Sequence, residues 1–293
     1  MATTKEASYF PWISKFMINP IHVMLWTYRR QEKDVRHLYN TFRDFMKLAT
    51  GGEMLNFGYW NNGCKDPLQA QMKLCHLMLN FVDLKPNQIV LDVGSGKNGP
   101  AMLWYNLMNP IEIICVDICG RNHYRLDHNL NLLEASALSL PLKDNCVDRI
   151  VALECAQHFR PIRKFLTNAF RIIKKGGMLG LAVPGIKKEQ LGWRDKKDLG
   201  LLNITWPSER HNISALPALL ESIGFHNIEV QFIGKNVYEP LADYYSSHRE
   251  EIRSAVIPRY SHFVEYTIFK SILAMKKIAQ NGIIDYALIK ASV

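Results

Sequence analysis

The feature that most constrains the fold is a short apolar run that passes directly into a glycine-rich loop. Residues 88–94 (Gln-Ile-Val-Leu-Asp-Val-Gly) are typical of a buried strand, and the spacing Gly94-x-Gly96-x-x-Gly99 follows at once. Glycine allows positive φ and lets a ligand approach the backbone closely. A strand, a glycine loop and then a helix predict that a nucleotide-like ligand binds beside the loop.

Comparable apolar runs alternate with helical patterns along the rest of the chain. The clearest helix is expected at 162–173, before Lys174-Lys175-Gly176-Gly177, which is typical of a helix end. A second is expected at 214–223. This alternation predicts an α/β fold with a doubly wound, mostly parallel sheet. Besides 88–94, strands are expected at 111–117, 147–153, 178–183, 227–233 and 285–291.

Two kinds of segment fall outside this alternation. Residues 1–80 show helical spacing and are expected to form an N-terminal extension or lid, followed by the main domain at 81–293. Within that domain, about 186–207 and 239–279 are too long for plain connections, and we interpret them as caps over the ligand end of the sheet. Trp206 is one of several aromatic residues in these caps that could line an apolar substrate pocket.

Composition excludes several classes of protein. With 48% hydrophobic and 22% charged residues, the 293-residue chain is neither a disordered tail nor a low-complexity repeat. Six cysteines without a C-x-x-C pair, and no zinc-type histidine pair, predict no metal and a reducing, cytoplasmic location. The net charge of +9 suits an anionic small molecule or membrane surface, but no basic block typical of nucleic-acid binding occurs.

The aromatic stretch at residues 9–26 has three open interpretations. It is interrupted by prolines and polar residues, so it is expected neither to span a membrane nor to be a signal peptide. It could lie on a bilayer as an interfacial helix, close over an apolar pocket as a lid, or pack on the core.

Two acidic residues narrow the identity of the ligand. Asp92 lies two residues before Gly94, where its carboxylate would repel a pyrophosphate and attract a cationic amino group. Asp117 ends the next expected strand and can accept hydrogen bonds from both hydroxyls of a ribose. A ligand with a ribose and an ammonium group but no phosphate is S-adenosylmethionine.

The chain from about residue 50 to 293 resembles the class I S-adenosylmethionine-dependent methyltransferases. The resemblance is nearest to bacterial natural-product O-methyltransferases, with ubiquinone and sterol C-methyltransferases nearby, and it implies a seven-stranded Rossmann-like sheet with an antiparallel final hairpin. The stretches that carry it are Leu55–Trp60, Leu91–Gly96 with Gly99–Ala101, Val116–Ile118, Ala137–Leu142 with Val147–Asp148, Leu153–Phe159, Gly224–Phe225 and Gly282–Leu288.

The resemblance also implies a set of site residues. His158 is the candidate base that takes a proton from a hydroxyl acceptor, since histidine is the commonest acid–base side chain, and the alternative is a structural histidine that caps the next helix or lines the pocket. Asn98 replaces the usual third glycine of the loop, and Ser136 replaces an acidic residue that contacts adenine. The expected cofactor contacts are Asp92, Gly94, Ser95, Gly96, Asn98, Asp117, Ile118, Ser136, Ala137, Glu154, Tyr59 and Trp60. The rings of Tyr59 and Trp60 could flank the methionine end, or they could form an aromatic pair in the core.

The sequence therefore predicts methyl transfer to a small lipophilic or glycosylated molecule, most simply at a hydroxyl oxygen. Carbon methylation of a prenyl substrate is the alternative, and an anionic diphosphate would suit the positive charge. Two other classes stay open: a nicotinamide-dependent oxidoreductase, because the glycine spacing permits it, and a non-catalytic membrane-surface module.

Overall fold

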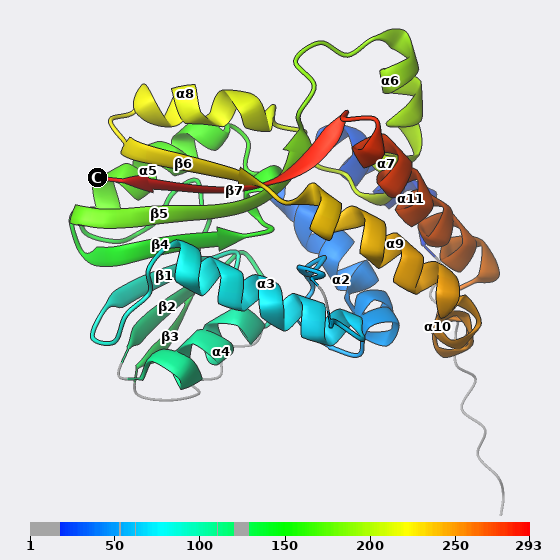
Figure 1. Ribbon diagram of the computed structural model, residues 1–293, viewed down its shortest axis with the longest axis horizontal. Coiled ribbons are helices and arrows are strands. Elements are labelled where there is room, and N and C mark those ends of the chain that lie inside the picture. Colours follow the sequence, from blue (N-terminus) through cyan, green and yellow to red (C-terminus); the bar gives the residue numbers. More distant parts are fainter. Residues whose placement is uncertain (1–17, 53, 62, 110, 120–128) are drawn as a thin grey trace, which may run out of the picture.

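The computed structural model describes residues 18–52, 54–61, 63–109, 111–119 and 129–293, and it contains a seven-stranded sheet (Figure 1). The spatial order of the strands is β3-β2-β1-β4-β5-β7-β6. Their bounds are Ile89–Val93 (β1), Glu112–Asp117 (β2), Leu130–Glu134 (β3), Val147–Leu153 (β4), Ile173–Ile186 (β5), His226–Phe232 (β6) and Ile284–Ser292 (β7).

The strand directions confirm the predicted fold class. β1 pairs in parallel with β2 and β4, β2 with β3, and β4 with β5, whereas β7 runs antiparallel to β5 and β6. Two local details differ from the pattern-based expectation. β3 was not among the strands expected from hydrophobic patterns, and β5 begins at Ile173, so Lys174 to Gly177 continue as strand after the helix instead of forming a connection.

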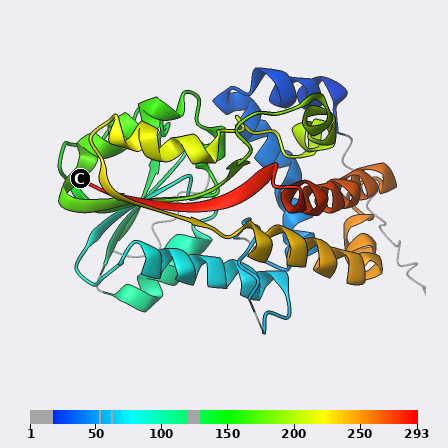
Figure 2. The same cartoon turned by 45° about the horizontal axis from the view of Figure 1, so that its top comes forward.

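Helices cover both faces of the sheet (Figure 2). On one face lie α3 (Pro67–Phe81) and α4 (Gly99–Met108), and on the other lie α5 (Ile162–Ile172) and α8 (Leu216–Glu221). Side chains of β1 alternate between these layers: Val90 joins the core beneath α3, and Leu91 and Val93 join the core beneath α5.

A third layer of helices lies beyond the carboxyl ends of the parallel strands (Figure 1). Phe45 of α2, Tyr245 of α9 and Ile268 of α11 share a buried apolar cluster there. No helix within the described ranges is long and apolar enough to cross a lipid bilayer. The helices of this layer are α1 (Pro20–Met24), the π-helix η1 (Leu25–Arg29), α2 (Glu32–Thr50), α6 (Trp193–Asp198), α7 (Gly200–Thr205), α9 (Tyr238–Ser247), α10 (Arg249–Val256) and α11 (His262–Gln280).

The aromatic stretch at 9–26 is only partly described, because residues 1–17 lie outside the described ranges. The described part passes from α1 into η1, where Trp26 is buried and Tyr28 is exposed. Single-turn segments complete the fold: η2 (Ala156–His158), η3 (Ile213–Ala215) and η4 (Gly234–Asn236).

Candidate active site

The glycine loop after β1 adopts the strained backbone that its sequence predicts. Gly94 and Gly96 have φ values of +70° and +56°, and Asn98 takes the left-handed conformation with φ +60° directly before α4. Asparagine tolerates this conformation better than most residues. The N–H groups of Gly94 and Ser95 both donate to the Val116 carbonyl, 2.7 and 3.2 Å away, which ties the loop to the end of β2.

Asp92 lies at the inner end of this loop, and one of its oxygens has no hydrogen-bond partner within the described ranges. Its side chain is 2% exposed, and Oδ2 is buried without a hydrogen bond. Burial, and to a lesser extent the charge of Asp117, raises the pKa of the Asp92 carboxyl to about 7. A buried carboxylate without a donor is costly unless a ligand supplies one, so the site favours a cation.

Asp117, at the end of β2, is fixed by two backbone donors. Its Oδ2 accepts from the Gly96 N–H at 3.0 Å, and its Oδ1 accepts from the Cys119 N–H at 2.7 Å. Each carboxylate oxygen retains a further lone pair for a ligand. The next residue, Ile118, lines the same cavity.

Two cavities meet at the carboxyl ends of the strands. A cleft of about 760 Å³ runs over the glycine loop past Asp92 and Asp117, and a second pocket of about 150 Å³ lies beneath the helical layer. Methyl transfer or any other two-ligand reaction needs its reactants in contact. The two cavities adjoin at a set of residues that line both of them, here called the shared wall. The shared residues are Tyr39, Arg43, Leu55, Glu154 and His158.

His158 lies in this shared wall, in the single turn η2 after β4. Its Nε2 is 2.9 Å from the Tyr39 hydroxyl, and the two rings meet edge-on. Burial, with a smaller contribution from nearby His211, lowers the pKa of His158 to about 4. The imidazole is therefore neutral near pH 7 and able to accept a proton.

Glu154 occupies the shared wall beside it, in a left-handed conformation with φ +53°. Its Oε1 accepts hydrogen bonds from the Phe57 N–H and the Tyr286 hydroxyl, both at 2.9 Å. Burial raises the pKa of Glu154 to about 8, so the carboxyl is mostly protonated near pH 7. Its polar contacts join β4, β7 and the segment before α3.

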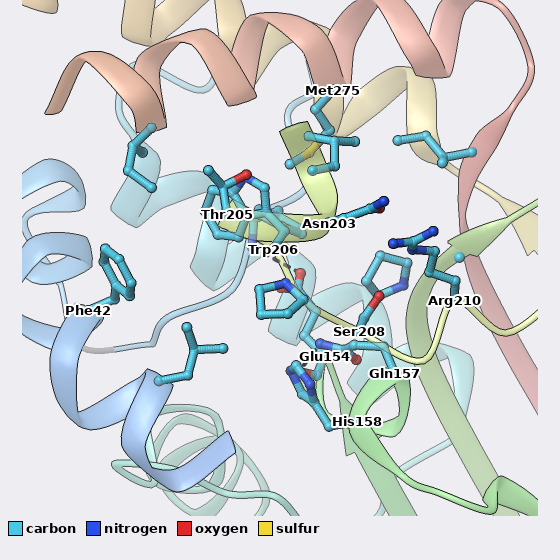
Figure 3. Close-up of a pocket in the computed structure, with 18 of the residues that line it drawn as sticks. Phe42, Glu154, Gln157, His158, Asn203, Thr205, Trp206, Ser208, Arg210 and Met275 are labelled. Atoms are coloured by element: carbon cyan, nitrogen blue, oxygen red, sulfur yellow. Dashed lines mark hydrogen bonds between the residues drawn. The ribbon is translucent and has the colours of Figure 1, made fainter. Parts of the chain in front are cut away.

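The smaller pocket is largely apolar on one side and polar on the other (Figure 3). Phe42 of α2 lies on the apolar side, and Asn203, Ser208 and Arg210 lie on the opposite side. Of the cap aromatic residues, Trp206 is part of the lining, whereas Trp193 is 71% exposed. The other apolar lining residues include Leu38, Phe45, Met46, Leu199, Leu202, Ile268 and Met275.

The structure does not bring every expected residue to the cavities. Tyr59 and Trp60 line neither one, which favours the core interpretation of these two rings. Their backbone N–H groups donate to Ala70 and Asn236, and the Trp60 indole donates to the Phe57 carbonyl. The Trp60 ring packs against Tyr244, with ring centroids 5.4 Å apart, and Tyr59 packs against the core beneath α3.

Asn98 and Ser136 also lie outside the lining of the large cleft, whereas Ala137 is part of it. Asn98 shapes the loop through its backbone. The Ser136 hydroxyl donates to the Glu32 carboxylate and accepts from the Leu138 N–H at 3.1 Å, which links the strand end to α2.

Sequence reasoning missed the contribution of α2 to the wall of the cleft. Arg36, Tyr39, Asn40 and Arg43 line the cleft from this helix at spacings of three, four and seven residues. That periodicity marks one helical face and could have pointed to them. Arg210, in the loop after α7, offered no such signal. Within the described part of the chain, no cluster of His, Cys, Asp or Glu could hold a metal ion.

Replacing Gly94 with alanine is expected to destabilise the ligand-free protein more than a φ penalty alone would. The new Cβ would lie 2.4 Å from the Cys155 Cβ and 2.8 Å from its Sγ. The left-handed backbone alone costs about 1–2 kcal/mol for a residue with a side chain. Gly176→Ala is the matched control, because Gly176 has φ +77° and nothing within 4 Å of its added Cβ. Thermal unfolding should show the larger loss for Gly94→Ala, and equal losses would contradict the clash.

Comparison with known proteins agrees with this geometry. Residues 91–181 match a family described as a methyltransferase domain. The chain is 28% identical over 243 residues to erythromycin 3''-O-methyltransferase of Saccharopolyspora erythraea, and the match covers 75% of this chain and 78% of that enzyme. A sterol 24-C-methyltransferase of Gibberella zeae is 26% identical over 161 residues, which are 50% of this chain and 40% of that enzyme.

Among solved structures, the mycolic acid cyclopropane synthase CmaA1, complexed with SAH and CTAB, has the same fold. It superposes with a TM-score of 0.76 at 18% identity, and the alignment covers 90% of this chain and 98% of that one. The sheet that carries the cleft described above is therefore shared with a protein whose structure contains SAH.

Proposed function

Because the chain is a class I S-adenosylmethionine-dependent methyltransferase, we propose that it methylates a hydroxyl oxygen of a small, largely apolar molecule. The observation that carries this proposal is the wall shared by the two cavities. The large cleft suits the cofactor, the apolar pocket suits the acceptor, and His158 lies between them as a neutral proton acceptor.

The residues of the large cleft fit the cofactor, S-adenosylmethionine. Asp92 would bind the ammonium group, because its buried Oδ2 lacks a donor. Asp117 would accept hydrogen bonds from the ribose hydroxyls, and Ala137 would lie along the adenine side. When bound, S-adenosylmethionine supplies an activated methyl group on a positively charged sulfur.

In this proposal, the proton of the acceptor hydroxyl passes to the Tyr39 oxygen, and Tyr39 passes its own proton to His158 Nε2. The Tyr39 hydroxyl already lies 2.9 Å from that atom and holds the ring in place. Burial keeps the pKa of Tyr39 above its ordinary value, so Tyr39 stays neutral and can relay a proton without becoming charged. A base of this kind contributes roughly 10²–10⁴-fold to the rate.

The helical layer is expected to close the site over the bound ligands. We propose that α2, within the extension at residues 1–80, acts as a lid, and that segments 186–207 and 239–279 act as caps. The lining of the small pocket draws on each of them, through Phe42, Trp206 and Ile268 respectively. Enclosure by apolar side chains excludes water from the transferring methyl group.

Carbon methylation is a second candidate, and one observation favours it. The low pKa of His158 makes it a weak base, and the transfer of a methyl group to an alkene needs no base in that step. The similarity to a sterol 24-C-methyltransferase over half of the chain agrees with this alternative.

The two candidates differ in the atom that receives the label from methyl-tritiated S-adenosylmethionine. The protein is incubated with a panel of hydrophobic alcohols, phenols and alkenes, and the products are assigned by mass spectrometry and NMR. We expect labelled methyl ethers from the hydroxylated compounds and none from their ready-made ethers. Label on carbon would contradict oxygen methylation, and so would transfer to alkenes alone.

A further inference from the structure

The polar side of the small pocket contains an arginine that the proposed chemistry does not use. Arg210 lines this pocket from the loop after α7, in a left-handed conformation with φ +49°. Within the described ranges its side chain forms no hydrogen bond or ion pair. The neighbouring acid, Glu209, lies 3.6 Å from Arg160 instead. Half-burial and the charge of Arg30 lower the pKa of Arg210.

The ionisable groups of the pocket give it a positive charge near neutral pH. The lining contains Arg43 and Arg210, while the other ionisable groups are uncharged. Burial raises the pKa of Glu154 to about 8 and lowers that of His158 to about 4. The pKa values of the lining tyrosines, Tyr39 and Tyr238, lie above their ordinary value. Two guanidinium groups therefore face an otherwise neutral, apolar space.

Among the residues that the structure describes, two buried carbonyl oxygens in the same lining lack hydrogen-bond donors. Gln157 Oε1 and Asn203 Oδ1 are both buried without a partner. Gln157 precedes His158, and its amide N–H donates to the Glu154 carbonyl at 2.6 Å, so its oxygen is held beside the shared wall. Buried polar atoms in folded proteins almost always have partners, and a ligand hydroxyl is a donor that could serve here.

Together, the guanidinium groups, the two unpaired carbonyl oxygens and the apolar lining indicate which kind of ligand fits this pocket. A planar guanidinium binds carboxylate or phosphate through two parallel hydrogen bonds. Figure 3 shows Arg210 and Asn203 on one side of the pocket, across from Phe42. The arrangement suits an apolar body, an acidic group near Arg210, and a hydroxyl near Gln157 and His158.

We propose that the methyl acceptor is a hydrophobic hydroxy acid whose anionic group binds Arg210. This inference rests on the proposed function for the position of the reacting hydroxyl. Arg210 acts here as a specificity-determining residue: it selects the acceptor by charge and takes no part in the transfer.

The test compares acids with uncharged partners of the same shape. The probes are ω-hydroxy fatty acids of increasing chain length and their primary amides, with affinity measured by calorimetry on the full chain saturated with S-adenosylhomocysteine. We expect at least one acid to bind roughly 10- to 100-fold more tightly than its amide, as for hydrogen bonds to a charged group. If no acid in the series binds better than its amide, the proposal is wrong.

Variants of Arg210 test whether this residue causes the preference for acids over amides. Arg210→Met should remove the preference for the acid, Arg210→Lys should retain part of it, and neither should change the affinity for S-adenosylmethionine, because Arg210 does not line the large cleft. Arg194→Met is the matched control at an exposed position. A preference that survives in Arg210→Met would also overturn the proposal.

The outcomes separate this inference from the proposed function. If the acid preference depends on Arg210 but labelled methyl appears on carbon, oxygen methylation is wrong and the acid site stands. If hydroxyl methylation occurs equally with acids and amides, the proposed function stands and the role of Arg210 is wrong.

Discussion

Replacing Asp92 with alanine is expected to weaken the binding of S-adenosylmethionine severely. The carboxylate is 2% exposed, and its Oδ2 has no partner within the described residues, so the ligand ammonium would be its principal counter-charge. Removing one member of a buried charged pair costs about 2–5 kcal/mol, which corresponds to roughly 30- to 5,000-fold in Kd. Titration calorimetry with S-adenosylmethionine measures the loss, and near-wild-type affinity would contradict the assignment.

The same carboxylate should make cofactor affinity depend on pH. In the free protein, burial raises the pKa of Asp92 to about 7, and a bound ammonium would lower it again. Binding below pH 7 must therefore release a proton, and Kd should rise by up to tenfold for each pH unit between 7 and 5. Asp92→Asn, which has the same shape and no charge, should bind weakly and without this slope.

Unfolding cannot account for the lost affinity. A raised carboxyl pKa means that the native state holds the proton more tightly than the unfolded state, so this group stabilises the ligand-free protein at low pH. That contribution is lost as the pH rises through about 7. Asp92→Asn should consequently be at least as stable as the wild type above pH 7, as measured by thermal unfolding without ligand.

Replacing His158 with alanine is expected to lower turnover by roughly 10²–10⁴-fold, the usual contribution of a general base. The affinity for S-adenosylmethionine should change little, because the expected cofactor contacts around Asp92 and Asp117 remain. Single-turnover kinetics with a hydroxylated acceptor measure the rate, and calorimetry measures the affinity. Unaltered turnover would exclude His158 from the mechanism.

Two controls separate proton transfer from packing. Tyr39→Phe removes the hydroxyl 2.9 Å from Nε2 but keeps the ring, and it should cost less than His158→Ala because the imidazole remains. His226→Ala changes an exposed histidine outside both cavities and should leave turnover at the wild-type level. A larger loss in Tyr39→Phe than in His158→Ala would transfer the proton-accepting role to the tyrosine.

The sheet could be predicted largely because its central strands are buried on both faces. Continuous apolar runs such as residues 88–94 and 147–153 are strong signals of such strands. β3 lies at the edge of the sheet, and Leu130 is its one fully buried residue, whereas Asn131 and Glu134 are exposed. Its sequence therefore carries no comparable apolar run. β5 starts directly after α5, where glycines and lysines resemble an ordinary helix end.

The site was predictable where the chemistry is local and not where it depends on tertiary packing. Asp92 and Asp117 each follow from a strand end and a neighbouring motif. Tyr39 and Arg210 reach the pocket from segments far from that motif in sequence. For Tyr59 and Trp60 the sequence leaves a ligand contact and core packing equally open, and only the tertiary structure shows the Trp60 ring against Tyr244 and Tyr59 against the core.

The position of α2 has a consequence for how enzymes of this kind can be altered. One helix supplies Tyr39 and Arg43 to both cavities at once. If the acceptor and the cofactor occupy these cavities as we propose, exchanging residues 32–50 for those of a relative is expected to change the affinity for both ligands in a single step. Under this proposal, selection for a new acceptor through α2 would also change the affinity for the cofactor, whereas a change at Arg210 itself, which lines only the small pocket, would not.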